Sequence, residues 1–329
     1  MDVELVSRLS GTTLEQWQAL LHRAGLEPDT DSDSTVLIRD GGELIAAASR
    51  RENLLKCIAV DDSRQGEGLT ATLLTALRQD AFQNSFRHLF LYTKPQNRYL
   101  FSDLFFYPIA ETDKVLLMED KPDGIGQFLQ TLPVAPSTGT VGAAVMNCNP
   151  FTKGHRYLIE TAAKQCDRLY IFVLSEDKSE FSAKDRLEMV KLGTADLPNV
   201  TVLPTGPYLI SSTTFPTYFL KDRENAETVH CLLDIEIFCK YYAPKFSITR
   251  RFVGTEPLSP MTAQYNDALR QHLPEKGIDL CEIPRLEIGN TPVSASAVRK
   301  YLRNGEYAQL KQLLPQTTYE YLLTHGFIK

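Results

Sequence analysis

The second half of the chain alternates short apolar runs with helical patterns, and this alternation constrains the fold more than any other feature. The runs VGAAVMN, RLYIFVL and NVTVLP are continuously apolar, as strands buried on both faces require. Helical patterns lie between them in HRYLIETAAKQC and SAKDRLEMVKL. Strand–helix–strand order of this kind forms right-handed units with parallel strands. The sequence therefore predicts an open α/β domain with a parallel sheet.

The first part of the chain has strands of another kind. STVLIRD, GGELIAAASR and LLKCIAV have strand composition, and Asp40-Gly41-Gly42 supplies a hairpin turn between the first two. The helical pattern TATLLTALRQDAFQN follows them. This order predicts a mixed α/β domain ahead of the parallel one.

A segment dense in Pro, Gly, Ser and Thr separates the two patterns. It is KPDGIGQFLQTLPVAPSTGT, at residues 121–140. A length of 329 residues also exceeds the usual size of one domain. We therefore expect two domains, over residues 1–130 and 131–329.

Composition limits the kinds of partner. A formal net charge of −6 argues against a general nucleic-acid binder, which usually carries a basic footprint. The six cysteines form no C-x-x-C pair and are expected to be reduced thiols. No apolar run reaches the length of a membrane-spanning helix, and the N-terminus lacks a secretory pattern. We expect a cytoplasmic protein with no nucleic-acid or membrane partner, and we assign no metal ligands.

The loop NCNPFTKGH, at residues 147–155, joins the first parallel strand to its helix. Ligands of open α/β folds bind at this carboxyl edge of the sheet. Gly154 lets backbone approach a ligand, and the N–H groups of the helix that starts near His155 attract anionic oxygens. Lys153 adds a full positive charge. The loop therefore indicates a site for a triphosphate.

Three polar side chains in this loop suit phosphate chemistry. His155, in the first helical turn, can donate to an oxygen of the phosphorus under attack, and Thr152 can donate from its hydroxyl. Asn149 is assigned to nucleotide binding with them. Alternatively, the loop is an ordinary turn without a function. A strand, a turn, the Thr-x-Gly-His pattern and a helix occur together here, however, which favours the functional interpretation.

A second candidate anion site lies near the C-terminus, in TPVSASAVR at residues 291–299. Ser294 or Ser296 suits the N-cap of the helix SAVRKYLRNG, and either hydroxyl can instead bind phosphate. Arg299 follows with a guanidinium that matches two phosphate oxygens. Taken alone this is a capped helix with a surface arginine, but with the first loop it forms the other half of a triphosphate clamp.

Together the two loops resemble the signatures of a nucleotidyltransferase superfamily. The first signature is His/Thr-x-Gly-His, and Thr152-Lys-Gly-His155 has its Thr form. The second is Ile-Ser-Ser-Thr-x-x-Arg, of which Val293-Ser-Ala-Ser-Ala-Val-Arg299 is a conservative variant. The resemblance implies a Rossmann-like, cytidylyltransferase-like domain that uses ATP.

The neighbouring segments narrow the resemblance to citrate lyase ligases. MNCNPFTKGHRYLIE, FSAKDRLEMVKLG, YLISSTTFPTYFLKD, FVGTEPLSPMTAQYN and the SASAVR helix occur in the order found in those enzymes. The resemblance implies a ligase that uses ATP, Mg²⁺ and acetate to acetylate the phosphopantetheine-like thiol on the acyl carrier subunit of citrate lyase. Acetate would attack the α-phosphorus of MgATP, and the thiol would then take the acetyl group from acetyl adenylate.

The site residues expected from the loops and the resemblance fall into two groups. The expected catalytic residues are His155, Lys153, Thr152 and Arg299. The expected nucleotide-binding residues are Asn149, Gly154, Arg186, Gly254, Glu256, Ser294 and Ser296.

Glu256 has an alternative of equal weight, and Arg186 also has a second interpretation. Gly254 ends the strand RRFVG and Glu256 follows it, so the Glu256 carboxylate can accept bonds from a ribose or adenine, or can cap the next turn. Arg186 belongs to a helix that faces the site in related enzymes, where it would hold a phosphate or remain on the surface. The stretch 210–213, Ile-Ser-Ser-Thr, matches the second signature superficially, but Pro216 stands where Arg is needed. In the resembled family this stretch would shape the acyl or thiol pocket.

The first domain resembles GNAT acetyltransferases at their acyl-CoA-binding segment. The family pattern is Gln/Arg-x-x-Gly-x-Gly/Ala, and here Gln65 and Gly68 match while Thr70 replaces the last Gly or Ala. Backbone N–H groups at a helix start would receive the pyrophosphate of a CoA-like group. The preferred hypothesis is an inactive domain that docks the arm of the carrier.

Two other enzymatic functions stay open. One is an adenylyltransferase of the pantetheine-phosphate or nicotinamide-mononucleotide type, whose acceptors are phosphorylated whereas acetate is not. The other is an N-acetyltransferase that uses the first domain. A non-catalytic scaffold is disfavoured, because two phosphate-binding motifs at matching positions would then be accidental.

Overall fold

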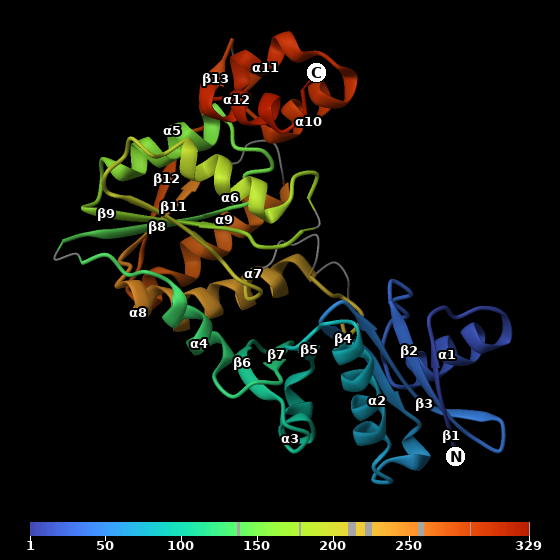
Figure 1. The fold of residues 1–329 in the computed structure, drawn as a ribbon. Coiled ribbons are helices and arrows are strands. Elements are labelled where there is room, and N and C mark those ends of the chain that lie inside the picture. Colours follow the sequence, from blue (N-terminus) through green and yellow to red (C-terminus); the bar gives the residue numbers. More distant parts are fainter. Residues whose placement is uncertain are drawn as a thin grey trace. The chain divides into compact units, whose positions relative to one another are not determined.

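The computed structural model describes residues 1–136, 139–177, 179–209, 215–220, 226–255, 260–289 and 291–328. Two compact units make up the chain (Figure 1). Unit 1 contains Met1–Ile125 and Pro216–Val229, and unit 2 contains Gly126–Phe215 and His230–Lys329. The boundary expected at residue 130 falls inside helix α4 (Gly124–Thr131). The assignment of 216–229 to unit 1 has no counterpart in the sequence patterns.

Unit 1 is a mixed α/β domain built on one seven-stranded sheet. The strand order is β1-β2-β3-β4-β5-β7-β6. Leu69, Leu73, Leu74 and Leu77 of one helix are buried against the sheet. The strands are β1 (Asp2–Val6), β2 (Ser34–Asp40), β3 (Glu43–Arg51), β4 (Leu54–Val60), β5 (Phe90–Thr93), β6 (Tyr107–Glu111) and β7 (Leu116–Glu119), and the helices before α4 are α1 (Gly11–Arg23), α2 (Leu69–Gln83) and α3 (Arg98–Ser102).

Two features of this sheet are the predicted β2–β3 hairpin and a notch between β4 and β5. Strands β2 and β3 pair as the expected hairpin, and both Gly41 and Gly42 take the positive φ that its turn requires. Strands β4 and β5 are parallel but pair only at Leu54 and Leu55. Beyond that point the two strands separate, which opens a notch in the sheet.

Unit 2 has a five-stranded parallel sheet in the order β10-β9-β8-β11-β12. The predicted strands and helices are confirmed, with ends that move by a few residues. The strands are β8 (Val141–Met146), β9 (Arg168–Val173), β10 (Val200–Pro204), β11 (Arg250–Gly254) and β12 (Asp279–Ile283). The helices are α5 (Lys153–Ala163), α6 (Ala183–Leu192), α7 (Ala226–Ile237), which starts in unit 1, α8 (Ala243–Phe246), α9 (Pro260–His272), α10 (Ala295–Asn304), α11 (Tyr307–Leu313) and α12 (Gln316–Thr324).

Side chains on both faces of the unit 2 sheet are buried. On β9, Leu169 and Ile171 belong to the core that includes α5 and α6. Phe172, on the opposite face of the same strand, packs edge-on against Tyr242 and Phe246, with ring centroids 5.3 Å apart in both pairs. Burial on two faces explains why these strands are apolar without alternation. No helix in the described ranges is long and apolar enough to cross a membrane.

Candidate nucleotide site

A cavity of about 630 Å³ opens at the carboxyl edge of the parallel sheet in unit 2. It lies where β8 ends beside β11, the point at which the strand order continues in opposite directions. Open α/β sheets bind ligands at this switch point. The cavity brings together eight residues expected from the sequence: Asn149, Thr152, Gly154, His155, Gly254, Ser294, Ser296 and Arg299.

The first turn of α5 is held by reciprocal hydrogen bonds between Thr152 and His155. The hydroxyl of Thr152, the N-cap residue, accepts from the His155 N–H at 3.4 Å. The Thr152 N–H donates to His155 Nδ1 at 3.1 Å. This is a capping box with histidine in the place of the usual Glu or Gln. Because Nδ1 is an acceptor, the neutral imidazole carries its proton on Nε2.

Burial, together with the positive charge of Arg285, lowers the pKa of His155 to about 4. At neutral pH the ring is therefore uncharged and donates through Nε2–H. The neutral ring keeps Nδ1 as the acceptor of the Thr152 N–H and presents Nε2–H as a donor for a phosphate oxygen.

Gly154 brings the two sequence motifs into contact. A Cβ atom at Gly154 would lie 3.2 Å from the Val293 carbonyl oxygen and 3.5 Å from the Val293 Cβ. The start of α5 and the loop before α10 are thus packed backbone to backbone, which explains the glycine physically. The sequence predicted close approach to a ligand at this position, and the structure shows close approach to the second motif.

The second motif forms the N-terminus of α10. The Ser294 hydroxyl, at the N-cap, accepts from the Ala297 N–H at 3.2 Å, and the Ser296 hydroxyl donates to it at 3.2 Å. Arg299 reaches across to the first loop, where its Nη1 donates to the Asn149 carbonyl at 2.5 Å. Its Nε lies 3.7 Å from the Glu180 carboxylate. Arg299 therefore joins the two motifs as well as lining the cavity.

Lys153 and Arg186 are not among the residues that line the cavity. The Lys153 ammonium donates to the Lys311 carbonyl at 2.9 Å. Arg186 is fully buried, so a surface position for it is wrong. Its guanidinium donates to Asn147 Oδ1 at 2.7 Å and to the carbonyls of Asn147, Leu174, Phe181 and Glu176. These bonds hold the start of the loop 147–155 on the side away from the cavity.

Two further expectations concern Gly254 and Glu256. Gly254 ends β11 beside the cavity, and its carbonyl accepts from the Asn266 side chain at 2.9 Å. Glu256 lies outside the described residues, as does the stretch 210–213. Cys148 lines the cavity but is buried, and burial raises the pKa of its thiol well above the ordinary value. A buried thiol of this kind is a poor nucleophile.

Outside the two predicted loops, sequence reasoning missed three polar residues of the cavity. They are Tyr265 and Asn266 on α9 and Arg285 after β12. Arg285 had a usable signal, because it follows the strand LCEIP at the same edge as the first loop. The Tyr265 hydroxyl donates to the Asp234 carboxylate at 2.5 Å, a partner 31 residues away that no local pattern indicates.

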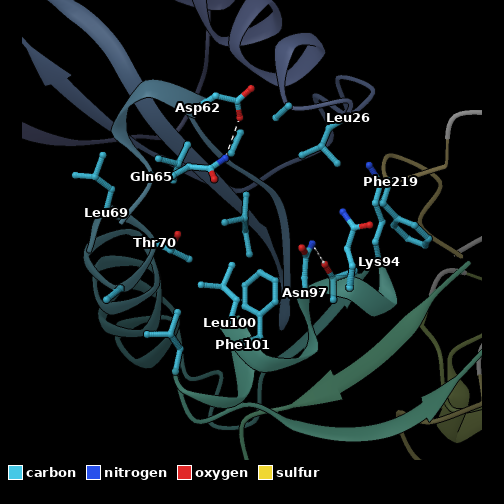
Figure 2. Close-up of a pocket in the computed structure, with 18 of the residues that line it drawn as sticks. Leu26, Asp62, Gln65, Leu69, Thr70, Lys94, Asn97, Leu100, Phe101 and Phe219 are labelled. Atoms are coloured by element: carbon cyan, nitrogen blue, oxygen red, sulfur yellow. Dashed lines mark hydrogen bonds between the residues drawn. The ribbon is translucent and has the colours of Figure 1, made fainter. Parts of the chain in front are cut away.

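A second cavity, of about 620 Å³, lies within unit 1 at the notch between β4 and β5 (Figure 2). Gln65, Leu69 and Thr70 lie on one side of it, and Lys94 and Phe219 lie on the opposite side. The predicted loop at residues 65–70 therefore lines a cavity. Gly68 precedes α2 with a φ of 76°, a conformation that suits glycine.

The residues 216–220 complete the wall of this cavity. The Tyr218 hydroxyl donates to the Tyr92 carbonyl at 2.7 Å, and the Tyr218 carbonyl accepts from the Glu27 N–H at 2.8 Å. The Phe219 ring is stacked on that of Tyr92 with centroids 6.4 Å apart. Both Tyr218 and Phe219 are buried.

Comparisons with known proteins match both units. A family model described as the citrate lyase ligase C-terminal domain matches residues 141–322, and one described as the acetyltransferase (GNAT) family matches residues 3–100. A citrate (pro-3S)-lyase ligase from Klebsiella pneumoniae is 40% identical over 92% of this chain and 90% of its own length. One from Escherichia coli K12 is 38% identical over 96% of this chain and 92% of its own.

Among solved structures, TmcAL from Thermotoga maritima bound with alpha-thio ATP matches 56% of this chain and 55% of that chain. The identity is 14% and the TM-score 0.37.

Replacement of Arg186 by Gln should destabilise the fold rather than act on the nucleotide alone. Two buried and two partly buried carbonyls would lose a charged donor, so the free energy of unfolding should fall by about 3 kcal/mol or more. Urea denaturation without nucleotide measures this change. Arg270→Gln, at an exposed ion pair on α9, is the control and should alter stability little. Wild-type stability in Arg186→Gln, with weakened ATP binding, would instead support a phosphate-binding role.

Protonation of His155 should destabilise the fold as the pH falls. Its ordinary pKa of about 6.5 applies in the unfolded chain, whereas the folded value is lowered to about 4. The unfolded chain therefore binds the proton first, and stability present above pH 6.5 is lost between about pH 6.5 and 4. Unfolding free energies at pH 7 and pH 5 measure the loss, which should be smaller in His155→Gln. An equal loss in both proteins would contradict the lowered pKa.

Proposed function

Because this chain belongs to the citrate lyase ligase family, whose members activate citrate lyase by ATP-dependent acetylation, we propose that the cavity of unit 2 forms acetyl adenylate. The single observation that best supports this proposal is the neutral His155 at the start of α5, which shares the cavity with the second motif. Acetate attacks the α-phosphorus of ATP, the bond between that phosphorus and the bridging oxygen breaks, and diphosphate leaves.

The residues act through position and charge rather than as nucleophiles. His155 donates through Nε2–H to an α-phosphate oxygen, where negative charge increases in the transition state. The N–H groups at the start of α10, Ser296 and Arg299 hold the phosphates that leave. Thr152 keeps the imidazole in the required tautomer, so it acts as a positioning residue. Arg186 positions Asn147 in the same way.

The charges of the cavity lining indicate how Mg²⁺ and Lys153 would take part in the reaction. None of the described residues lining the cavity is a carboxylate, which suits Mg²⁺ that enters as part of the MgATP substrate and is held mainly by phosphate oxygens. Lys153 would contribute its charge at longer range, since its ammonium is bonded to the Lys311 carbonyl.

The second half-reaction transfers the acetyl group to the carrier. The thiol of the acyl carrier subunit attacks the acyl carbon of acetyl adenylate, AMP leaves, and the thiol proton is released. The products are the acetyl thioester and AMP. This step requires the phosphopantetheine-like arm to reach the adenylate in the cavity of unit 2.

The cavity of unit 1 suits binding of the carrier's arm without catalysing a reaction on it. N–H groups at the start of α2 can donate to the phosphate at one end of the arm, and the notch between β4 and β5 can hold its narrow chain. Among the described residues lining this cavity the one carboxylate is Asp62, which accepts from Gln65 at 2.9 Å, and there is no histidine. An N-acetyltransferase needs a base to deprotonate its amine, so this lining favours docking.

Acetate-dependent exchange of labelled diphosphate into ATP tests the proposal with purified protein and Mg²⁺. We expect exchange in the wild type and a turnover about 10²-fold or more lower in His155→Ala, because one donor to the transition state is lost. ATP binding should change less than turnover. Exchange driven by a phosphorylated acceptor and not by acetate would favour an adenylyltransferase instead.

Binding of CoA to the full-length chain, measured by calorimetry, tests the docking role of unit 1. Thr70→Glu places a negative charge at the start of α2 and should weaken binding about tenfold or more. Thr75→Glu, one turn further along and outside the cavity, is the matched control. Both variants should keep acetate-dependent exchange. Transfer of acetyl groups from acetyl-CoA to amines without ATP would contradict the docking role.

A further inference from the structure

Arg285 is one of two arginines that line the cavity of unit 2. It follows β12 at the carboxyl edge of the sheet and lines the cavity together with His155. Its Nε donates to the Thr255 carbonyl at 3.0 Å, and the Thr255 N–H donates to the Ile283 carbonyl at 2.9 Å. These two bonds join the ends of β11 and β12, so the base of the guanidinium is held in place.

The positive charges of the cavity come from two arginines. The titratable side chains among the described lining residues are Cys148, His155, Tyr265, Arg285 and Arg299. Burial raises the pKa of the cysteine and of the tyrosine, so both are neutral at pH 7, and the imidazole is neutral too. The lining therefore carries two full charges, one on each guanidinium.

The two arginines occupy different parts of the site. Arg299 comes from α10 and is bonded to the Asn149 carbonyl of the first loop, close to Glu180. Arg285 is the cation whose charge acts on His155. Lys153, the third cation expected at the site, has its ammonium on the Lys311 carbonyl. Arg285 shares the cavity lining with His155, and its positive charge opposes protonation of the imidazole.

We propose that Arg285 binds the α-phosphate beside His155, while Arg299 binds the phosphates that leave as diphosphate. This assignment rests on the proposed formation of acetyl adenylate. The α-phosphate remains in the adenylate after diphosphate has left. Arg285 therefore acts in both half-reactions, and Arg299 acts in the first.

Separate measurement of the two half-reactions tests the assignment. The first is acetate-dependent exchange of diphosphate into ATP. The second is the acetylation of deacetylated citrate lyase by synthetic acetyl adenylate, without ATP. Arg285→Gln should lower both rates about 10²-fold, since a charged donor to the phosphate is lost. Arg299→Gln should lower the first rate by a similar factor and leave the second within about twofold.

The pH profile separates a phosphate-binding role from a purely structural one. In Arg285→Gln the charge that opposes protonation of His155 is absent, so the acid limb of the exchange rate should move to higher pH. Arg285→Lys keeps the charge and should keep the limb near its wild-type position. It should recover only part of the rate, because an ammonium cannot reproduce the planar fork.

Two controls complete the design. Arg270→Gln removes an exposed arginine outside the cavity and should leave both rates and the pH profile unchanged. Calorimetry of ATP binding to the same variants does not depend on acetate chemistry, so it tests Arg285 even if wild-type protein shows no exchange. Loss of exchange in Arg285→Gln with a wild-type second rate would place Arg285 on the diphosphate. Wild-type rates in both half-reactions would overturn the assignment.

Discussion

The reciprocal hydrogen bonds between Thr152 and His155 determine where α5 begins and which imidazole nitrogen faces the cavity. The Thr152 N–H is one of the donors that a helix start leaves without a partner inside the helix, and His155 Nδ1 accepts it. The same bond leaves the proton on Nε2, and burial keeps the ring neutral. A structural requirement of the helix and a chemical requirement of phosphate binding are therefore met by one pair of residues.

The sequence predicted those parts of the site that depend on neighbouring residues. The first loop, the N-cap at Ser294 and the strand RRFVG are local patterns, and the structure has all three. The burial of Arg186 was not predicted, because nothing local shows that its donors meet five backbone and side-chain oxygens behind the loop. Lys153 was expected in the cavity from its place in the motif, yet its bond to Lys311 spans 158 positions of the chain.

The cavity of unit 2 differs in charge from the molecule as a whole. The chain has a formal net charge of −6, while the described lining of the cavity has two guanidinium groups and no carboxylate. A concave site lined by one sign of charge concentrates its field, so an anionic nucleotide is attracted locally although the protein is acidic overall. Net charge describes the molecule as a whole and carried no information about this pocket.

The segment 216–229 makes unit 1 discontinuous along the chain. Its Tyr218 and Phe219 are buried against Tyr92, a residue synthesised more than a hundred positions earlier. On the ribosome, unit 1 cannot acquire this wall until much of unit 2 has also been made. A fragment that stops at Ile125 would expose the Tyr92 ring and carbonyl to water. The acetyltransferase-like half of this chain is therefore not a detachable module, and its folding is tied to synthesis of the ligase half.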